Sequence, residues 1–201
     1  MNSPYFSYLD EWSDITDITF RDRSKLGPLD AASHAIMRGK SELSIAQRET
    51  MAAYVSGLNA CSFCYGSHEA VAERFGVAST LIEALINDLD TAPISPNEIV
   101  LYKYLKKLTQ EPSKIWAKDA EAVFDAGWSE SALHDAILVA CLFNFYNRLL
   151  DGHGIKGNGA IYEMGAQHLS AKGYKVPWFI GAIKHIIFKA KRKQLKSKAT
   201  V

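Results

Sequence analysis

Two cysteines and a histidine stand close together in one short run of the sequence. The residues are Cys61, Cys64 and His68, and the run reads Asn59-Ala-Cys-Ser-Phe-Cys-Tyr-Gly-Ser-His68. If the run is helical, steps of about 100° per residue place these side chains within about 60° of one another on one face. A vicinal dithiol with a base one turn away can perform reversible disulfide chemistry, because a neighbouring imidazolium or a helix N-terminus favours the reactive thiolate.

The elements on either side of the dithiol are predicted to be two helices in sequence. The spacing of apolar residues predicts a helix over residues 44–58, and Ser44 and Gln47 at its start have the form of a capping box. Asn59 is a good N-cap for the next helix, which would carry the dithiol to residue 76. Cys61 would then lie in the first turn of that helix, where backbone N–H groups point outward.

Helical periodicity continues through most of the chain. Further helices are predicted over residues 78–89, 97–108, 116–126 and 129–149. Because no segment shows sustained alternation of polar and apolar residues, we predict an all-α fold, a helical bundle without a sheet. A faint self-similarity at an offset of 85 residues pairs Asn59 with Asn144 and His68 with His153. It suggests two duplicated helical units, with the chemistry kept only in the first.

Composition limits the classes of function. The chain has 201 residues, of which 48% are hydrophobic and 22% charged, so it can bury a full core. The net charge of +1 gives no overall attraction to nucleic acid or membrane, and neither is expected as a partner. The sequence start lacks the features of a secretory signal, and three cysteines are too few for a disulfide scaffold, so we expect a cytoplasmic protein.

The chain is expected to divide into an N-terminal segment, a helical domain and a basic tail. Their boundaries are predicted at residues 1–30, 31–183 and 184–201. The lysine-rich run in the tail is typical of a solvated helix end rather than a binding patch. The third cysteine, Cys141, lies in a strongly apolar run, and we predict that it is buried as a small hydrophobe.

Several kinds of chemistry compete for the dithiol. Covalent haem attachment requires a histidine directly after the second cysteine, where Tyr65 stands, and thioredoxin-like chemistry requires a βαβ context. Structural zinc requires a fourth ligand, and the chain offers only scattered histidines. Redox chemistry without a cofactor or metal is favoured, while zinc binding and simple burial of both thiols stay open. The scattered histidines are His34, His134, His153, His168 and His185.

Glu49 lies upstream of the dithiol, on the helix that precedes it. A tight turn between the two helices could bring its carboxylate back toward the thiols. Helical periodicity alone favours a simpler interpretation, in which Glu49 forms a surface ion pair with Arg48 or with a neighbouring chain.

The arrangement of Glu49, then Cys61-x-x-Cys64 after eleven intervening residues, then His68, resembles the alkylhydroperoxidase D and carboxymuconolactone decarboxylase superfamily. Two further stretches resemble its peroxidase-related branch in particular. One runs from Ile36 to Cys64, and the other includes Gly-Trp-Ser-Glu-Ser-Ala-Leu-His-Asp-Ala and the following Phe-Asn-Phe-Tyr-Asn-Arg, which ends at residue 148. The resemblance covers roughly residues 30 to 160.

This resemblance implies an all-helical, self-associating protein, a homo-oligomer, that reduces a hydroperoxide at the expense of a dithiol or protein reductant. It implies that Cys64 is the attacking thiol, that Cys61 is the resolving thiol, and that Glu49 and His68 form a proton relay. In alkylhydroperoxidase D itself a histidine precedes the second cysteine, and that position is Phe63 here. Two alternatives remain: a helical oligomer that senses oxidation or binds metal without turnover, and a cofactor-free, decarboxylase-like lyase, against which the two cysteines argue.

Overall fold

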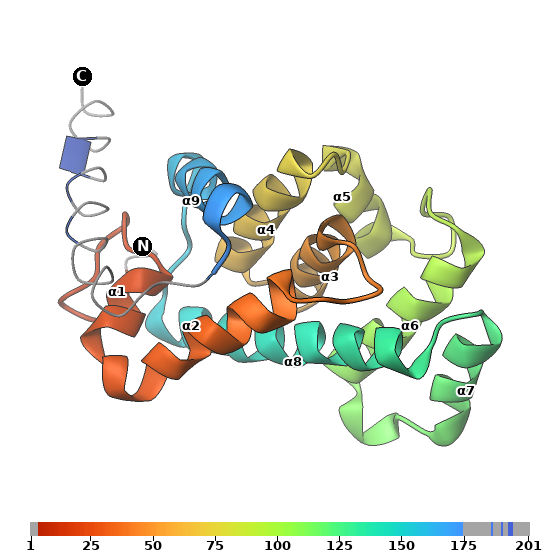
Figure 1. The fold of residues 1–201 in the computed structure, drawn as a ribbon. Helices are drawn as coiled ribbons and strands as arrows, with labels where there is room; N and C mark the ends of the chain where they lie inside the picture. Colours follow the sequence, from red (N-terminus) through yellow and green to blue (C-terminus); the bar gives the residue numbers. More distant parts are fainter. Residues whose placement is uncertain (1–3, 175–185, 187–189, 191–192, 195–201) are drawn as a thin grey trace.

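A computed structural model describes residues 4–174, 186, 190 and 193–194. Within these residues every regular element is a helix, which confirms the predicted all-α fold (Figure 1). The elements are α1 (Ile15–Arg21), α2 (Arg23–Arg38), α3 (Ile45–Leu58), α4 (Ser62–Arg74), α5 (Ser79–Asn87), α6 (Pro96–Gln110), the 3₁₀ turn η1 (Pro112–Lys114), α7 (Ala117–Asp125), α8 (Glu130–His153) and α9 (Gly159–Lys172).

The long helix α8 packs against α2, α3, α4, α6 and α7. Helix α3 packs against α8 on one side and against α4 on the other, and α9 covers α4 (Figure 1). The main core contains Met37, Tyr54, Leu101 and Phe143, all at most 1% exposed. A second buried cluster joins Cys61 and Cys64 to Phe63, Leu150 and Ile161. The dithiol therefore lies in the interior, at the junction of α4, α8 and α9.

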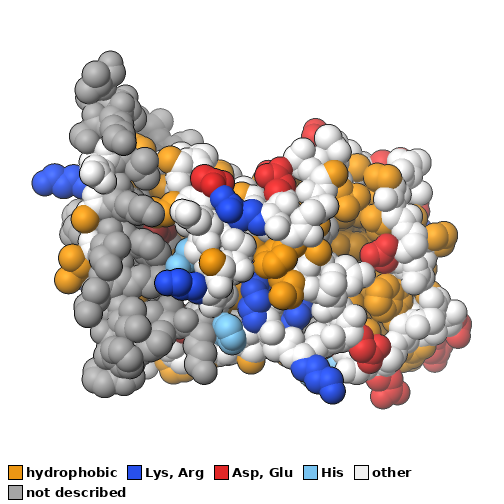
Figure 2. Space-filling model, turned by 45° about the horizontal axis from the view of Figure 1, so that its top comes forward, with side chains coloured by type: hydrophobic (Ala, Val, Ile, Leu, Met, Phe, Trp, Pro, Cys, Tyr) orange, Lys and Arg blue, Asp and Glu red, His pale blue; other side chains and the backbone are white. Residues whose placement is uncertain are grey.

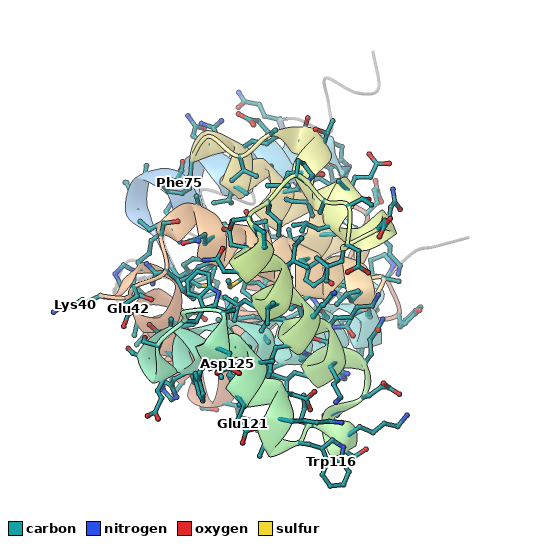
Figure 3. All side chains as sticks on the ribbon, turned by 90° about the vertical axis from the view of Figure 1, so that its right-hand side faces the viewer. Lys40, Glu42, Phe75, Trp116, Glu121 and Asp125 are labelled. Atoms are coloured by element: carbon teal, nitrogen blue, oxygen red, sulfur yellow. The ribbon has the colours of Figure 1, made fainter. Side chains whose placement is uncertain are left out.

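Local capping signals agree with the predicted helix starts. Ser44 and Gln47 form the expected capping box at the start of α3, and Ser129 caps α8 by accepting from the backbone N–H of Ala132. Gly127 follows α7 with a φ of 95°, a backbone conformation that glycine adopts without strain. Trp116 immediately precedes α7 and stays 64% exposed at the edge of the protein (Figure 3).

The prediction that Asn59 starts the dithiol helix is wrong. Asn59 is the C-cap of α3, and Cys61 is the N-cap of α4, one position outside the first turn that was expected. Ala60 makes the turn between them in the left-handed region, at a φ of 55°. The Asn59 side chain is not free to cap, because it donates to Asn144 at 3.1 Å and to Asn147 at 2.8 Å on α8.

The prediction that Cys141 is buried is also wrong, because its side chain is exposed. Helix α8 is apolar over much of its length, but only one side of it faces α3 and the core. Ala140 and Leu142 lie on that side and are buried, whereas Cys141 and Phe145 lie on the other. Phe145 is 43% exposed.

Two predictions about organisation can be compared with the helices. The proposed duplication would place a turn near Asn144 like the turn after Asn59, but α8 continues through Asn144 without one. The boundary predicted between residues 30 and 31 falls inside α2. Most of the basic tail, 184–201, lies outside the described residues.

The described surface carries charged side chains of both signs (Figure 2). On the face shown in Figure 2, basic side chains lie toward the left and centre of the view, and most acidic side chains lie along its top and right. Hydrophobic side chains gather on the right. Among the described residues, no helix combines the length and apolar character that crossing a membrane requires.

Candidate active site

The hairpin of α3 and α4 positions the dithiol. Because Cys61 is the N-cap and Cys64 lies in the first turn of α4, the two sulfurs are close enough to hydrogen-bond to each other. The hairpin turn is held by a backbone hydrogen bond of 3.0 Å from Cys61 N–H to the Ser56 carbonyl. Both thiols are enclosed, with Cys61 0% and Cys64 3% exposed.

Glu49 and His68 meet across the same hairpin, one from each helix. The distance from Glu49 Oε2 to His68 Nδ1 is 2.7 Å, and both side chains are buried. The interpretation of Glu49 as a surface ion pair with Arg48 is therefore wrong. Arg48 instead donates to the backbone carbonyls of Ile36 and Gly39, at 2.8 and 3.1 Å.

Two further residues fix the Glu49 carboxylate. Arg38, from α2, lies 2.6 Å from Oε1, and the Tyr174 hydroxyl donates to the same oxygen at 2.9 Å. Burial alone raises the pKa of Glu49, but the hydrogen bond from His68 and the charges of His68 and Arg38 outweigh it, so the pKa lies below its usual value. Glu49 is therefore a buried, ionised carboxylate.

The Glu49 contact decides which nitrogen of His68 can act as a base. An ionised carboxylate only accepts hydrogen bonds, so Nδ1 of the neutral imidazole carries the proton and Nε2 keeps a free lone pair. The ring is further held edge-to-face against Phe143, with 4.3 Å between ring centroids. The imidazole of His68 is thus held in a fixed position, one helical turn from Cys64.

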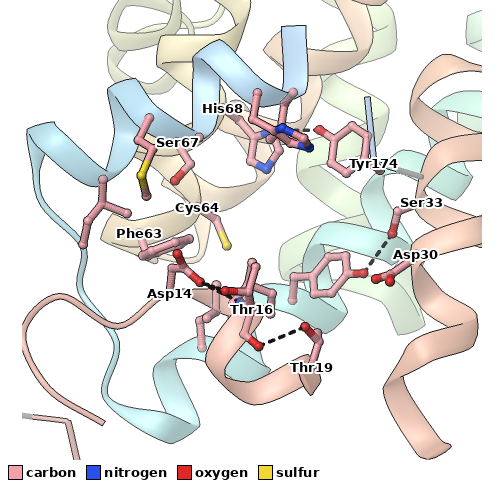
Figure 4. A pocket seen from close by; sticks show the side chains of 18 of the residues that line it. Asp14, Thr16, Thr19, Asp30, Ser33, Phe63, Cys64, Ser67, His68 and Tyr174 are labelled. Atoms are coloured by element: carbon pink, nitrogen blue, oxygen red, sulfur yellow. Dashed lines mark hydrogen bonds between the residues drawn. The ribbon is translucent and has the colours of Figure 1, made fainter. Parts of the chain in front are cut away.

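A cavity of about 160 Å³ connects the histidine and the thiol. Cys64 and His68 both project into it (Figure 4). Helices α1, α2, α8 and α9 and Tyr174 complete its wall, so the N-terminal segment is part of the site. Most of the lining is apolar, and the apolar residues include Phe63, Phe143, Leu150, Ile161, Met164 and Leu169.

The two thiols have opposite electrostatic environments. The hydrogen bond from Cys64 lowers the pKa of Cys61, and the backbone N–H of Cys64 acts in the same direction. The pKa of Cys64 is raised, because it hydrogen-bonds to Cys61 and because it is buried. The surroundings therefore favour ionisation of Cys61 over that of Cys64.

The structure brings all four predicted site residues, Glu49, Cys61, Cys64 and His68, into one region of the α3–α4 hairpin. Sequence reasoning missed Arg38 and Tyr174. A buried carboxylate requires a compensating charge, which is a reason to search for an arginine near Glu49, but nothing local to Tyr174 indicates its role. At the position of the expected family histidine, the Phe63 ring instead packs edge-to-face on Tyr162, with 6.1 Å between centroids.

Across the described part of the chain, no group of at least three His, Cys, Asp or Glu side chains is arranged to hold a metal ion.

Solved structures with the same fold include two peroxidase-related proteins. An uncharacterized peroxidase-related protein from Silicibacter sp. TM1040 aligns with a TM-score of 0.68 and 25% identity, over 74% of this chain and 78% of that one. An uncharacterized peroxidase-related protein from Ralstonia eutropha JMP134, described as an alkylhydroperoxidase AhpD core, aligns with a TM-score of 0.67 and 19% identity over the same shares. No protein-family model and no curated protein matches the chain.

These likenesses define the class of fold. The chain has the all-helical fold of the alkylhydroperoxidase D core, as the spacing of Glu49, Cys61, Cys64 and His68 indicated. The two solved structures described above are peroxidase-related proteins, which is the branch that the sequence resembles.

Proposed function

We propose that this protein is a thiol-dependent peroxidase that reduces hydroperoxides through the Cys61–Cys64 dithiol. The observation that carries the proposal is that a carboxylate-bound histidine and a cysteine thiol open into one cavity. A buried ion pair without an adjacent nucleophile would serve structure alone. Here the basic nitrogen of His68 and the sulfur of Cys64 face the same small space, where a peroxide can reach both.

In the proposed reaction His68 Nε2 removes the Cys64 proton, and Glu49 stabilises the imidazolium that forms. The Cys64 thiolate attacks the distal peroxide oxygen, so that an S–O bond forms and the O–O bond breaks. The departing alkoxide takes the proton from His68 and leaves as an alcohol. Cys64 is then a sulfenic acid, and His68 is neutral again.

Cys61 completes the oxidative half of the cycle. Its thiolate attacks the Cys64 sulfur, the S–O bond breaks and the S–S bond forms. The hydroxide that leaves takes a proton from solvent, which balances the proton that Cys61 released when it ionised. The lowered pKa of Cys61 suits this role, because the resolving sulfur is then ionised before the sulfenic acid appears. A dithiol or protein reductant returns the disulfide to the dithiol.

The cavity supports an organic substrate of modest size. Its volume of about 160 Å³ and its largely apolar wall favour a hydroperoxide with an apolar group over hydrogen peroxide. Phe63, which occupies the position of a family histidine, adds to the apolar wall.

Peroxide consumption in the presence of excess dithiothreitol tests the proposal. We expect many turnovers per protein chain with cumene hydroperoxide, and loss of turnover in Cys64→Ser. Oxidation of a single equivalent without turnover would reject the enzyme in favour of a redox sensor. Measuring the metal content of the same preparation tests the alternative of a metal-binding protein. Stoichiometric zinc that blocks oxidation of the thiols would support that alternative.

We also propose that the protein is a homo-oligomer, as its resemblance implies. The exposed face of α8, with Phe145 and Cys141, offers apolar surface for such an assembly. Sedimentation velocity at micromolar concentration should show a species heavier than the 22.3 kDa chain, and a strict monomer would reject the expectation.

A further inference from the structure

Asn147 is a buried amide that contacts the dithiol hairpin from α8. It is 1% exposed. Its Nδ2 lies 2.9 Å from the Ser56 hydroxyl, and its Oδ1 lies 2.8 Å from Asn59 Nδ2. Both partners belong to the end of α3, just before the turn that leads to the cysteines. The amide is therefore held by the hairpin that carries the thiols.

The first contact fixes which end of the amide faces Ser56. The Ser56 hydroxyl donates its only proton to the backbone carbonyl of Ala52, at 2.7 Å. Its oxygen can then only accept a hydrogen bond from Asn147. The NH₂ group of Asn147 must therefore point toward Ser56.

A second, independent series of hydrogen bonds gives the same orientation of the Asn147 amide. Asn144 donates from Nδ2 to the backbone carbonyl of Ala140 at 2.9 Å, so its Oδ1 is the atom that accepts from Asn59. The same NH₂ group of Asn59 also donates to Asn147, which must therefore accept with its Oδ1. Each series of hydrogen bonds begins at a backbone carbonyl, which can only accept. The orientation of the Asn147 amide group is therefore determined.

This orientation leaves one N–H of Asn147 for the active-site sulfur. The Asn147 side chain makes a hydrogen-bonding contact with Cys64. The hydrogen bond to Cys61 and burial both raise the pKa of the Cys64 thiol, whereas the contact with Asn147 lowers it. An amide does not titrate, so this donor is present at every pH.

We propose that Asn147 is a further catalytic residue, which donates a hydrogen bond to the Cys64 sulfur and holds it as a thiolate. Its role in turnover rests on the proposed peroxidase function. In the attack on peroxide the N–H supports the nucleophile before the S–O bond forms. When a dithiol reductant attacks Cys61, the S–S bond breaks with its electron pair moving to Cys64, and the same N–H supports the departing thiolate.

The test measures the Cys64 thiol alone, without peroxide. In a Cys61→Ser, Cys141→Ser background, the rate of alkylation of Cys64 by iodoacetamide is followed against pH. The variants are Asn147→Ala and the isosteric Asn147→Asp. Thr109→Val is the matched control, because it removes a buried hydroxyl 3.4 Å from Asn144, at the far end of the amide chain.

Loss of a hydrogen bond to a charged group should raise the apparent pKa of Cys64 by about 1 to 2 in Asn147→Ala. Alkylation at pH 7 should then slow by about 10- to 100-fold. Asn147→Asp should raise the pKa at least as far, because a carboxylate repels the thiolate. Thr109→Val should keep the parent profile.

Apart from the carboxylate that Asn147→Asp adds, every titratable group around Cys64 is the same in the variants and in the Cys61→Ser, Cys141→Ser parent. These groups are Asp14 at the N-cap of α1, Asp30 on α2, His68 on α4, Tyr146 and Asp151 on α8, Tyr162 and His168 on α9, and Tyr174.

Parent and Asn147 variants with identical alkylation profiles and unchanged circular dichroism would overturn the proposal and leave Asn147 a structural residue. Asn147→Ser replaces either variant if that variant loses its helical signal. The outcome is separate from that of the peroxidase proposal. Shifted profiles in a protein that consumes no peroxide would retain the role of Asn147 at the thiol and reject the enzyme.

Discussion

Glu49 Oε2 lies 2.7 Å from His68 Nδ1, although the two residues are 19 positions apart and on different helices. The contact exists because α3 and α4 fold back on each other at the turn that carries Cys61. The geometry of the turn and the geometry of the relay are therefore linked, and a change in either should be visible at the Cys64 thiol.

Replacing either relay residue should slow peroxide reduction. In Glu49→Gln or His68→Gln the Cys64 proton loses its acceptor or the group that stabilises that acceptor, and general acid–base catalysis typically contributes about 10²- to 10⁴-fold. We expect a loss of that size at neutral pH, with part of the rate returning at high pH, where the thiol ionises unaided. Stopped-flow rates across pH measure both effects, and wild-type rates in both variants would remove the relay from the mechanism.

Acid should weaken the fold through Glu49. Its pKa is lowered in the folded protein, so its contribution to stability is complete above the ordinary value of 4.5 and is lost as the pH falls through the lower folded value. The difference in unfolding free energy between wild type and Glu49→Gln should therefore shrink as the pH falls below about 4.5. Urea denaturation at several pH values measures it. A difference that stays constant with pH would show that Glu49 is not ionised in the folded protein.

Gly66 should tolerate no side chain. It lies on α4 between Cys64 and His68, and an added Cβ would overlap the ring of Tyr162 on α9. That ring cannot move freely, because its hydroxyl donates to the carbonyls of Ser62 and Lys156. We expect Gly66→Ala to lower the free energy of unfolding by about 1 to 3 kcal/mol, as overpacked cores do.

The control for this substitution is Gly165→Ala on α9, where an added Cβ meets no atom within 4 Å. Relief of glycine's backbone entropy should make that variant more stable by about 0.5 to 1 kcal/mol. Urea denaturation of both variants tests the packing of α9 on α4, and equal stabilities would contradict it.

The sequence predicted the parts of the site that depend on local contacts. The Ser44–Gln47 capping box and the approximate limits of α3 and α8 follow from residues within a turn of each other. Asn59 was misassigned because its side chain bonds to Asn144, 85 positions away, instead of capping its own helix. Cys141 was misassigned because an apolar run does not show which side of a helix faces the core.

The supporting residues of the site depend on distant contacts. Tyr174 reaches Glu49 across 125 positions, and no spacing rule in one sequence relates them. Glu49 itself was assigned to the site by resemblance, because helical periodicity alone favoured the surface. The burial of Glu49 depends on how distant helices pack around it, and in the folded protein its side chain is 0% exposed.

The most direct test of the account is the reaction of pre-reduced protein with one equivalent of cumene hydroperoxide, followed by stopped flow and mass spectrometry. Wild type should consume the peroxide and form the Cys61–Cys64 disulfide. Cys61→Ser should consume one equivalent and retain a trapped sulfenic acid on Cys64, and Cys64→Ser should consume none. Consumption by Cys64→Ser but not by Cys61→Ser would contradict the account and make Cys61, the thiol with the lowered pKa, the attacking residue.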